Sequence, residues 1–286
     1  MGKKRGKLPQ IFVAADAALR RKRTVAAVYI LLRFLVIATM VAQFFNGNYE
    51  SVFLCLLTLV LLLLPTIMER ALMVDLPNTL EIIIMLFIFA AEILGEIRSF
   101  YTTFQSWDTI LHTINGFLCA AIGFALVDML NRNERFSLTL SPTYMAVVAF
   151  CFSMTIGVLW EFFECGMDQL FFLDMQKDTI VNTISTVMLD PTGGNTPVAI
   201  RDITDVIVVT ADGEEIALGL GGYLDIGILD TMKDLFVNFV GAVVFSFIGY
   251  FYVKNRGKGR FASRFIPKVV DVIPEDRERA EEEKRD

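Results

Sequence analysis

The stretch SVFLCLLTLVLLLLPTIM, residues 51–68, decides the fold class because it contains no charged side chain. A helix needs about 20 such residues to cross the hydrocarbon core of a bilayer, which is about 30 Å thick. The whole chain agrees: of its 286 residues, 55% are hydrophobic and only 20% are charged. A water-soluble protein of this length needs more polar surface. The sequence therefore predicts an integral membrane protein.

Six stretches meet or approach the length of a membrane span: 24–45, 51–68, 79–94, 109–129, 143–163 and 231–253. The third is the shortest, but Glu81 and Glu92 at its ends are three helical turns apart and share one face. Arg33 in the first span can snorkel to the interface or pair inside the bundle. We predict an all-α polytopic membrane protein, a six-transmembrane-helix bundle.

Lys and Arg concentrate in the N-terminal stretch and in the connectors 69–78, 131–142 and 254–264, which lie on one side of the predicted bundle. The positive-inside rule places that side in the cytoplasm. We therefore predict a basic cytoplasmic N-terminus (1–23), a six-span membrane domain (24–253) and a charged cytoplasmic tail (254–286). Beside an apolar span, the basic cluster favours lipid contact over nucleic-acid binding. The cysteine spacing supports no zinc knuckle and no disulfide framework.

The long outer connector carries an insertion at about 174–229. The residues Val206–Thr210, Asp212-Gly213 and Glu215–Leu218 predict a small extracytoplasmic β-hairpin within it. The pattern D-x-x-K-D-x-x-V-N occurs twice, starting at Asp174 and at Asp230. Each copy either caps a helix start or forms one arm of a ligand site. We predict a cap for the first copy, whereas a ligand role gains weight for the second.

Polar side chains inside the spans follow single helix faces, and each costs roughly 2.5–3.5 kcal/mol at the bilayer centre. The predicted stripes are Glu92 and Glu96 on the third span, Asp108, His112 and Asn115 on the fourth, Glu161, Glu164 and Asp168 on the fifth, and Asp230, Asp234 and Asn238 on the sixth. In the predicted topology all four stripes lie in the outer half of the membrane. We expect them to line one outer-leaflet cavity, with Gly116, Gly157 and Gly241 allowing close helix approach.

One imidazole with several carboxylates suits a divalent metal ion such as manganese, iron, zinc or magnesium. His112 is the only histidine of the chain. The candidate metal ligands are His112, Glu161, Glu164 and Asp234. The candidate catalytic residues are His112, Asp108, Glu161 and Glu164, with Asp108 able to orient His112 as a general base. The candidate substrate- or ion-binding residues are Asp230, Asp234, Asn238, Glu92, Glu96 and Asn115.

Three motifs carry a resemblance to a known family. WDTILH (107–112) with Gly116, LWEFFE (159–164), and DTMKD (230–234) with Asn238 and Gly241 resemble the VanZ-like integral membrane proteins. They look closer still to relatives of the bacterial inner-membrane YjdF type. The resemblance covers about half the chain, and the second motif has Glu where glycopeptide-resistance members tend to carry Gln. It implies a cell-envelope protein of the bacterial inner membrane and supplies no reaction.

Three functions remain open. The first is a metal-assisted hydrolase or transferase acting on a lipid-linked substrate. The second is a proton- or cation-coupled transporter or ion-binding membrane protein, and the third is a structural assembly partner without catalysis. Polar stripes confined to the outer half weigh against transport. A single histidine and no nucleophile motif leave enzymatic activity uncertain. The expected partners are membrane lipids and a lipid-linked envelope substrate.

The topology predicts which single cysteines a membrane-impermeant thiol reagent reaches. A cysteine at Asp212 should be labelled from outside intact cells, and one at Asn133 only after the cells are opened. The opposite pattern at either position would overturn the orientation.

Overall fold

The computed structural model describes residues 23–72, 74–132, 139–255 and 262–269. It is mostly helical, and its residues form two compact units. The first unit comprises Met1–Met154 with Asn238–Asp286, and the second comprises Thr155–Val237. Most of the predicted N-terminal segment and cytoplasmic tail lies outside the described residues.

Five helical segments among the described residues are long and apolar enough to cross a membrane. They are α2 (Arg23–Phe45), the segment Tyr49–Ala71, α7 (Trp107–Arg132), α8 (Pro142–Phe171) and α9 (Ile228–Lys254). They coincide with five of the six predicted stretches. The chain is therefore a membrane protein with several apolar helices.

The third predicted span, 79–94, takes a different form, and the count of six is not confirmed. It is split between α5 (Asn78–Phe89) and a π-helix, η1 (Ala90–Ile97). The change to wider π hydrogen bonding at Ala90 ends the regular helix before it reaches spanning length. Gly95 in η1 has no Cβ, and the ring of Tyr101, just after helix α6 (Phe100–Thr103) begins, occupies that space.

The segment Tyr49–Ala71 contains a break that its sequence explains. Helix α3 (Tyr49–Leu61) begins where the Asn48 side chain accepts a hydrogen bond from Ser51 N at 3.1 Å. Helix α4 (Leu64–Leu72) carries Pro65 at its second position. Proline has no N–H to donate to the Leu61 carbonyl and tolerates only the first helical turn, so α3 ends and α4 starts anew.

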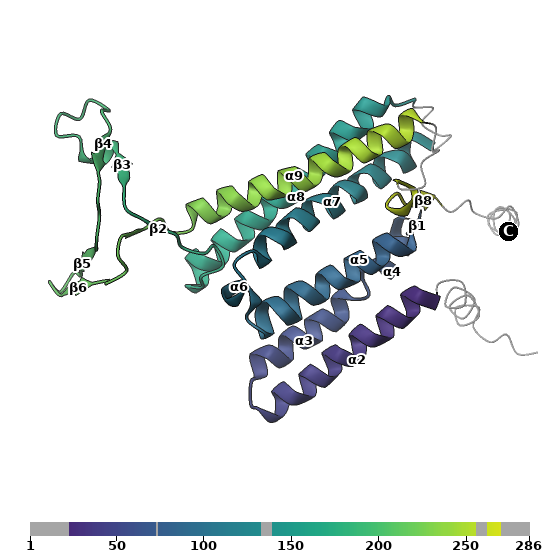
Figure 1. The fold of residues 1–286 in the computed structure, drawn as a ribbon, viewed down its shortest axis with the longest axis horizontal. Helices are drawn as coiled ribbons and strands as arrows, with labels where there is room; N and C mark the ends of the chain where they lie inside the picture. The colour runs from purple at the N-terminus through teal and green to yellow at the C-terminus, as the bar shows by residue number, and fades with distance from the viewer. Residues whose placement is uncertain (1–22, 73, 133–138, 256–261, 270–286) are drawn as a thin grey trace, which may run out of the picture. The chain divides into compact units, whose positions relative to one another are not determined.

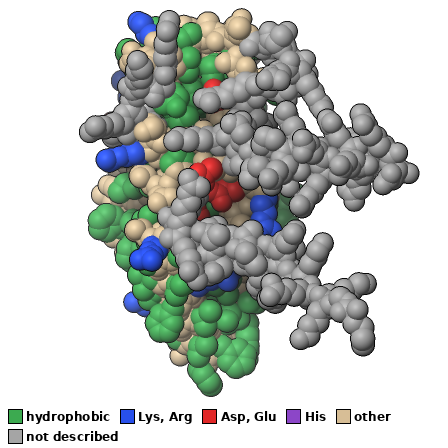
Figure 2. All heavy atoms as spheres, turned by 90° about the vertical axis from the view of Figure 1, so that its right-hand side faces the viewer, with side chains coloured by type: hydrophobic (Ala, Val, Ile, Leu, Met, Phe, Trp, Pro, Cys, Tyr) green, Lys and Arg blue, Asp and Glu red, His purple; other side chains and the backbone are tan. Residues whose placement is uncertain are grey.

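The core of the first unit lies between α2, α3, α5, α7 and α9, with α2, α3 and α5 side by side (Figure 1). Its fully buried side chains include Val36, Leu80, Phe124 and Phe245. Figure 2 looks at the end of this unit where α2 begins and α9 ends. Lys and Arg side chains lie there beside apolar flanks, and Asp and Glu side chains are visible near the middle of this face.

A segment after α9 returns to this core. The turn η3 (Ala262–Arg264) leads into strand β8 (Lys268–Val269), which pairs antiparallel with β1 (Val74–Asp75) before α5. Between them, Ile266 is buried, and the Phe265 ring meets the Phe117 ring edge-on at 5.2 Å. The segment η3–β8 therefore ties the end of α9 to the start of α5.

Within the first unit α7 and α9 run parallel and touch through backbone. A Cβ at Gly116 would collide with the carbonyl oxygen of Asn238, and one at Gly241 with the carbonyl oxygen of Thr113. Further along both helices, the Phe117 and Phe245 rings lie 5.1 Å apart. Small residues at a helix crossing permit such close approach, as the sequence predicted for Gly116 and Gly241.

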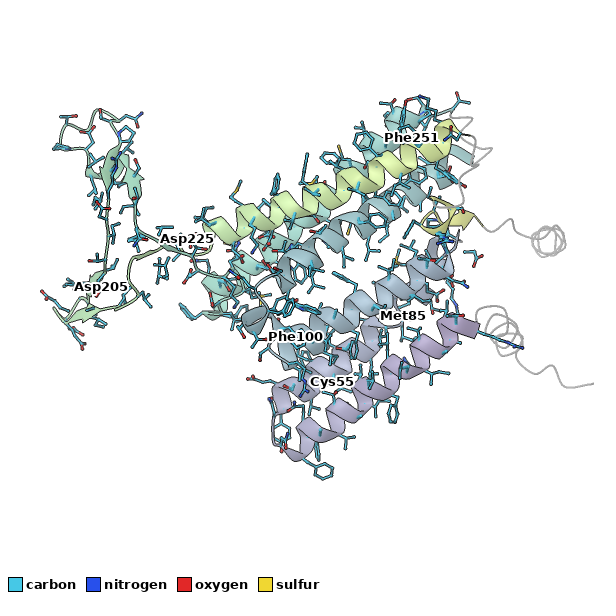
Figure 3. All side chains as sticks on the ribbon, viewed as in Figure 1. Cys55, Met85, Phe100, Asp205, Asp225 and Phe251 are labelled. Carbon is cyan, nitrogen blue, oxygen red and sulfur yellow. The ribbon has the colours of Figure 1, made fainter. Side chains whose placement is uncertain are left out.

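The second unit contains the C-terminal half of α8, the first turns of α9 and the connector between them. The connector forms three two-stranded antiparallel pairs: β2 (Ile180–Val181) with β7 (Tyr223–Leu224), β3 (Ile184–Thr186) with β4 (Val198–Ile200), and β5 (Ile207–Val209) with β6 (Glu215–Ala217). A short 3-10 turn, η2 (Val187–Leu189), follows β3. The last pair is the predicted hairpin. Asp205, labelled in Figure 3, closes it by accepting hydrogen bonds from Val206 N and Gly219 N, both at 2.8 Å.

Substituting alanine for Gly116 should destabilise the protein by about 1–3 kcal/mol, because the new methyl group would meet backbone that cannot move aside. Thermal unfolding in detergent measures the effect. Gly166→Ala in α8 is the matched control, since nothing lies within 4 Å of that position. The control should be neutral or more stable by about 0.5–1 kcal/mol; equal effects of the two changes would contradict the packing.

Candidate functional site

The first part of the candidate site is a carboxylate–imidazole pair at the start of α7. His112 Nε2 lies 3.4 Å from Asp108 Oδ1, one helical turn away. The His112 side chain is 10% exposed and that of Asp108 26%. A carboxylate at this distance orients the imidazole ring. The pair can therefore act as a general base or provide one nitrogen and one oxygen ligand.

One turn further along α7 a chain of amide groups joins α7, α8 and α9. Asn115 Nδ2 donates to Asn238 Oδ1 at 3.3 Å, and Asn238 Nδ2 donates to Met154 Sδ at 3.7 Å. Ser153 donates to the Gly116 carbonyl at 2.7 Å. Asn238 is 1% exposed, so its contacts are those of a buried group. These residues fix the register between the three helices, about one turn after His112 along α7.

The α8 acids belong to the second unit. Glu161 and Glu164 are both buried, at 4% and 8% exposure, and lie three residues apart on one face. Trp160 Nε1 donates to Glu164 Oε1 at 2.7 Å, which fixes the orientation of that carboxylate. Both carboxylates are thus held on one face of α8.

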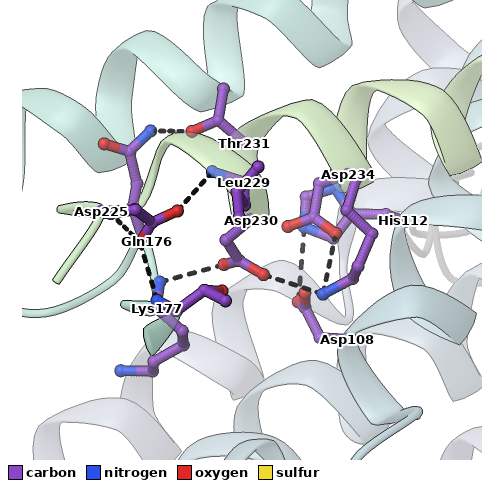
Figure 4. A network of polar contacts seen from close by, with 12 residues as sticks. Asp108, His112, Gln176, Lys177, Asp225, Leu229, Asp230, Thr231 and Asp234 are labelled. Carbon is purple, nitrogen blue, oxygen red and sulfur yellow. Dashed lines mark hydrogen bonds and ion pairs between the residues drawn. The ribbon is translucent and has the colours of Figure 1, made fainter. Parts of the chain in front are cut away.

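The α9 acids of the second unit share one lysine. Lys233 Nζ lies 2.8 Å from Asp230 Oδ1 and 3.7 Å from Asp234 Oδ1. Lys177 N donates to the second oxygen of Asp230 at 3.0 Å (Figure 4). A cation and a backbone N–H therefore both contact the Asp230 carboxylate. Asp234, at 1% exposure, is the most deeply buried acid of this helix.

Two further aspartates of the second unit hold the connector in place. Asp168 accepts hydrogen bonds from Met175 N at 2.6 Å and Gln176 N at 2.9 Å. Asp225 accepts from Thr179 N at 2.7 Å, Leu229 N at 2.9 Å and Gly227 N at 3.2 Å. Both carboxylates thus replace water as hydrogen-bond acceptors for backbone N–H groups at the two ends of the connector.

The predicted helix cap at Asp174 is wrong. The residues after it are extended and lead into β2, and the cap of α9 is Asp225, three residues before the helix begins at Ile228. The repeated pattern was misleading because the first copy pairs with the second: Lys177 of one copy binds Asp230 of the other. One sequence signal could have identified Asp225 as the residue that binds the start of α9. It is an aspartate, closely followed by Gly227, just before an apolar helix.

Glu92 and Glu96 lie in the π-helix η1 of the first unit, Glu92 half-buried and Glu96 exposed. Helix η1 packs against α3, α6 and α7. Of the predicted site residues, the first unit brings together Asp108 with His112 and Asn115 with Asn238. The second unit brings together Asp230 and Asp234 around Lys233.

Comparison with known sequences gives one result. A family described as "Predicted membrane protein (DUF2238)" matches residues 27–255 of the chain. No curated protein and no solved structure matches it.

The Asp225 anchor predicts a local pH dependence. Partial burial raises the pKa of this carboxyl, but the backbone N–H groups of Thr179, Leu229 and Gly227 together outweigh it and hold the pKa below its ordinary value of 3.8. Stabilisation by the anchor is therefore complete above pH 3.8 and is lost as the pH falls through the lower folded-state value. Amide hydrogen exchange at these three residues should accelerate, relative to the intrinsic rate, only below that pH.

The Asp225→Asn variant should show the faster exchange at every pH, because the amide oxygen is a weaker acceptor than a carboxylate. Asp212→Asn, in the exposed β5–β6 turn, is the matched control and should leave these amides unchanged. Equal exchange in Asp225→Asn and the wild type would rule out the anchor.

Proposed function

The chain belongs to the DUF2238 family of predicted membrane proteins, and we propose that it holds a divalent metal ion in an outer-leaflet site of the bacterial inner membrane. The proposed ligands are His112, Asp108 and Asp234. Glu161 and Glu164 are the proposed proton-carrying groups, or further ligands, and both termini face the cytoplasm. The resemblance to VanZ-like and YjdF-type proteins supports the envelope location.

The observation that carries this proposal is the register of α7 and α9 in the first unit. Asn115 bonds to Asn238, and the backbone of Asn238 lies against Gly116. His112 precedes Gly116 by four residues, and Asp234 precedes Asn238 by four residues on the same helix, α9. Because parallel helices keep their register over one turn, we expect Asp234 to reach the level of His112 and Asp108.

This donor set suits the proposed ion. One imidazole nitrogen and two carboxylate oxygens fit manganese, iron or zinc and leave positions for water or substrate. A bound ion would supply Lewis-acid polarisation and a water activated at neutral pH. Glu164, which Trp160 orients, is a proposed proton carrier, and Asn115 and Asn238 can position a polar substrate group. These features favour a hydrolase or transferase acting on a lipid-linked envelope substrate.

A specific observation supports cation or proton transport as the second candidate. Asp128 on α7 and Glu81 on α5 are buried at 6% and 8% exposure. Asp108 and Asp128 are 20 residues apart on α7, or about 30 Å at 1.5 Å per residue, which is the thickness of the hydrocarbon core. Acids at both depths, with Asp128 and Glu81 buried, are what a transport path requires.

Metal analysis of purified protein tests the site. The wild type should hold about one manganese, iron or zinc ion per chain, because the three proposed ligands suit a single ion. His112→Ala and Asp234→Asn should lose the ion, and Glu161→Gln should weaken its binding. Glu214→Gln, an exposed acid of the outer hairpin, is the matched control and should retain it. The proposal would be contradicted if the wild type were purified without metal and its thermal stability did not change when divalent cations were added.

Asp128→Asn separates the two candidate functions. A transporter should lose cation-coupled uptake into proteoliposomes while its outer site still binds metal. For a hydrolase or transferase, the same variant should leave metal binding and turnover unchanged.

A further inference from the structure

Two residues with large apolar side chains, at the base of the outer insertion, have left-handed backbone conformations that are unfavourable for them. Phe172, just after α8, has φ +57°, and Ile226, just before α9, has φ +52°. The left-handed region suits glycine, and a β-branched residue there is a strong outlier. Yet the two side chains are 91% and 79% exposed. Packing within the second unit therefore does not account for choosing Phe and Ile at these positions.

The surrounding hydrogen bonds hold this backbone in place. Phe172 N donates to the Asp168 carbonyl at 3.1 Å, and the Asp168 carboxylate binds the amides of Met175 and Gln176. On the other side, Asp225 binds the amides of Gly227 and Leu229, which flank Ile226. Both turns are thus rigid, and each directs a bulky apolar side chain outward.

The two turns are also fastened to each other. Gln176 Nε2 is hydrogen-bonded to Thr231 Oγ1, as Figure 4 shows. The missing Cβ of Gly227 lets the backbone of Gln176 pack against it. Phe172 and Ile226 therefore belong to one rigid base, formed by the end of α8 and the start of α9.

Exposed apolar residues surround both side chains. We call this set the collar: Leu170, Phe171, Phe172, Leu173, Ile226, Ile228, Leu229 and Met232, each at least 47% exposed. Along the same two helices the exposed apolar surface continues through Phe162 on α8 and Phe236 on α9. Since α8 and α9 both qualify as membrane spans, the collar continues a surface that faces lipid.

We propose that the collar inserts into the outer leaflet, with Phe172 and Ile226 as its anchors, and holds the outer insertion at the level of the lipid headgroups. The driving force is apolar burial, because residues 174–229 carry nine Asp and Glu against Lys177 and Arg201. Insertion is therefore independent of anionic lipid. The proposal does not depend on the metal site, since the collar contains none of its ligands.

Spin labelling in phosphatidylcholine nanodiscs tests the collar. In a chain whose four native cysteines are replaced, nitroxide labels are placed at Phe172, at Ile226 and, as the matched control, at Asp212. Oxygen partitions into lipid, and a water-soluble nickel chelate does not. The labels at Phe172 and Ile226 should be relaxed several-fold more by oxygen than by nickel, and the label at Asp212 more by nickel. Adding phosphatidylglycerol should not change the ratios.

Two outcomes would overturn the proposal. Low accessibility to both reagents would show that a second copy or another protein covers the collar, and dominant relaxation by nickel would show that it faces water. If labels at the left-handed positions impair folding, Leu170 and Ile228 provide helical alternatives in the same collar. In the double variant F172G/I226G, which suits the backbone, a label at Leu170 should become more accessible to nickel; no change would also contradict anchoring.

Discussion

The contact on which the rest of the first unit depends is the approach of α7 and α9 at Gly116 and Gly241. With no side chain between them, the backbones of the two helices touch. This contact brings Asn115 within hydrogen-bonding distance of Asn238 and leaves the Gly116 carbonyl available to Ser153. Polar groups that would be costly to bury alone thereby satisfy one another. The close contact at the two glycines therefore sets both the helix register and the polar hydrogen bonds of this unit.

In the second unit, polar side chains stabilise an irregular connector and not a contact between helices. Its connector has few buried side chains and only short strand pairs, which are marginally stable alone in water. The carboxylates of Asp168 and Asp225 compensate by binding backbone N–H groups on both sides of the connector. Asp168 and Asp225 are therefore structural partners of the backbone in this unit.

Residue spacing predicted those features that depend on neighbours along the chain. Charge-free length identified five spanning helices, Asp212-Gly213 identified a hairpin, and i, i+4 spacing identified the Asp108–His112 pair. Features set by distant contacts were missed. The π-helix at Ala90 lies where the Tyr101 ring packs on Gly95, and its hydrogen-bonding pattern leaves no mark in hydropathy.

The same limit applies to the candidate site. Asn115 and Asn238 were both predicted as site residues, but their pairing depends on which helices adjoin. Spacing likewise predicted that Asp174 caps a helix, although no helix follows it, and did not identify Asp225 at the start of α9.

The pairing of β1 with β8 has a consequence for biosynthesis. Ile266 and Phe265 complete a core otherwise built from helices that precede them in the chain. Until the ribosome has released the segment after α9, the start of α5 lacks the residues that cover it. This corner of the bundle therefore folds last. A chain interrupted before this segment exposes an incomplete core to quality-control proteases.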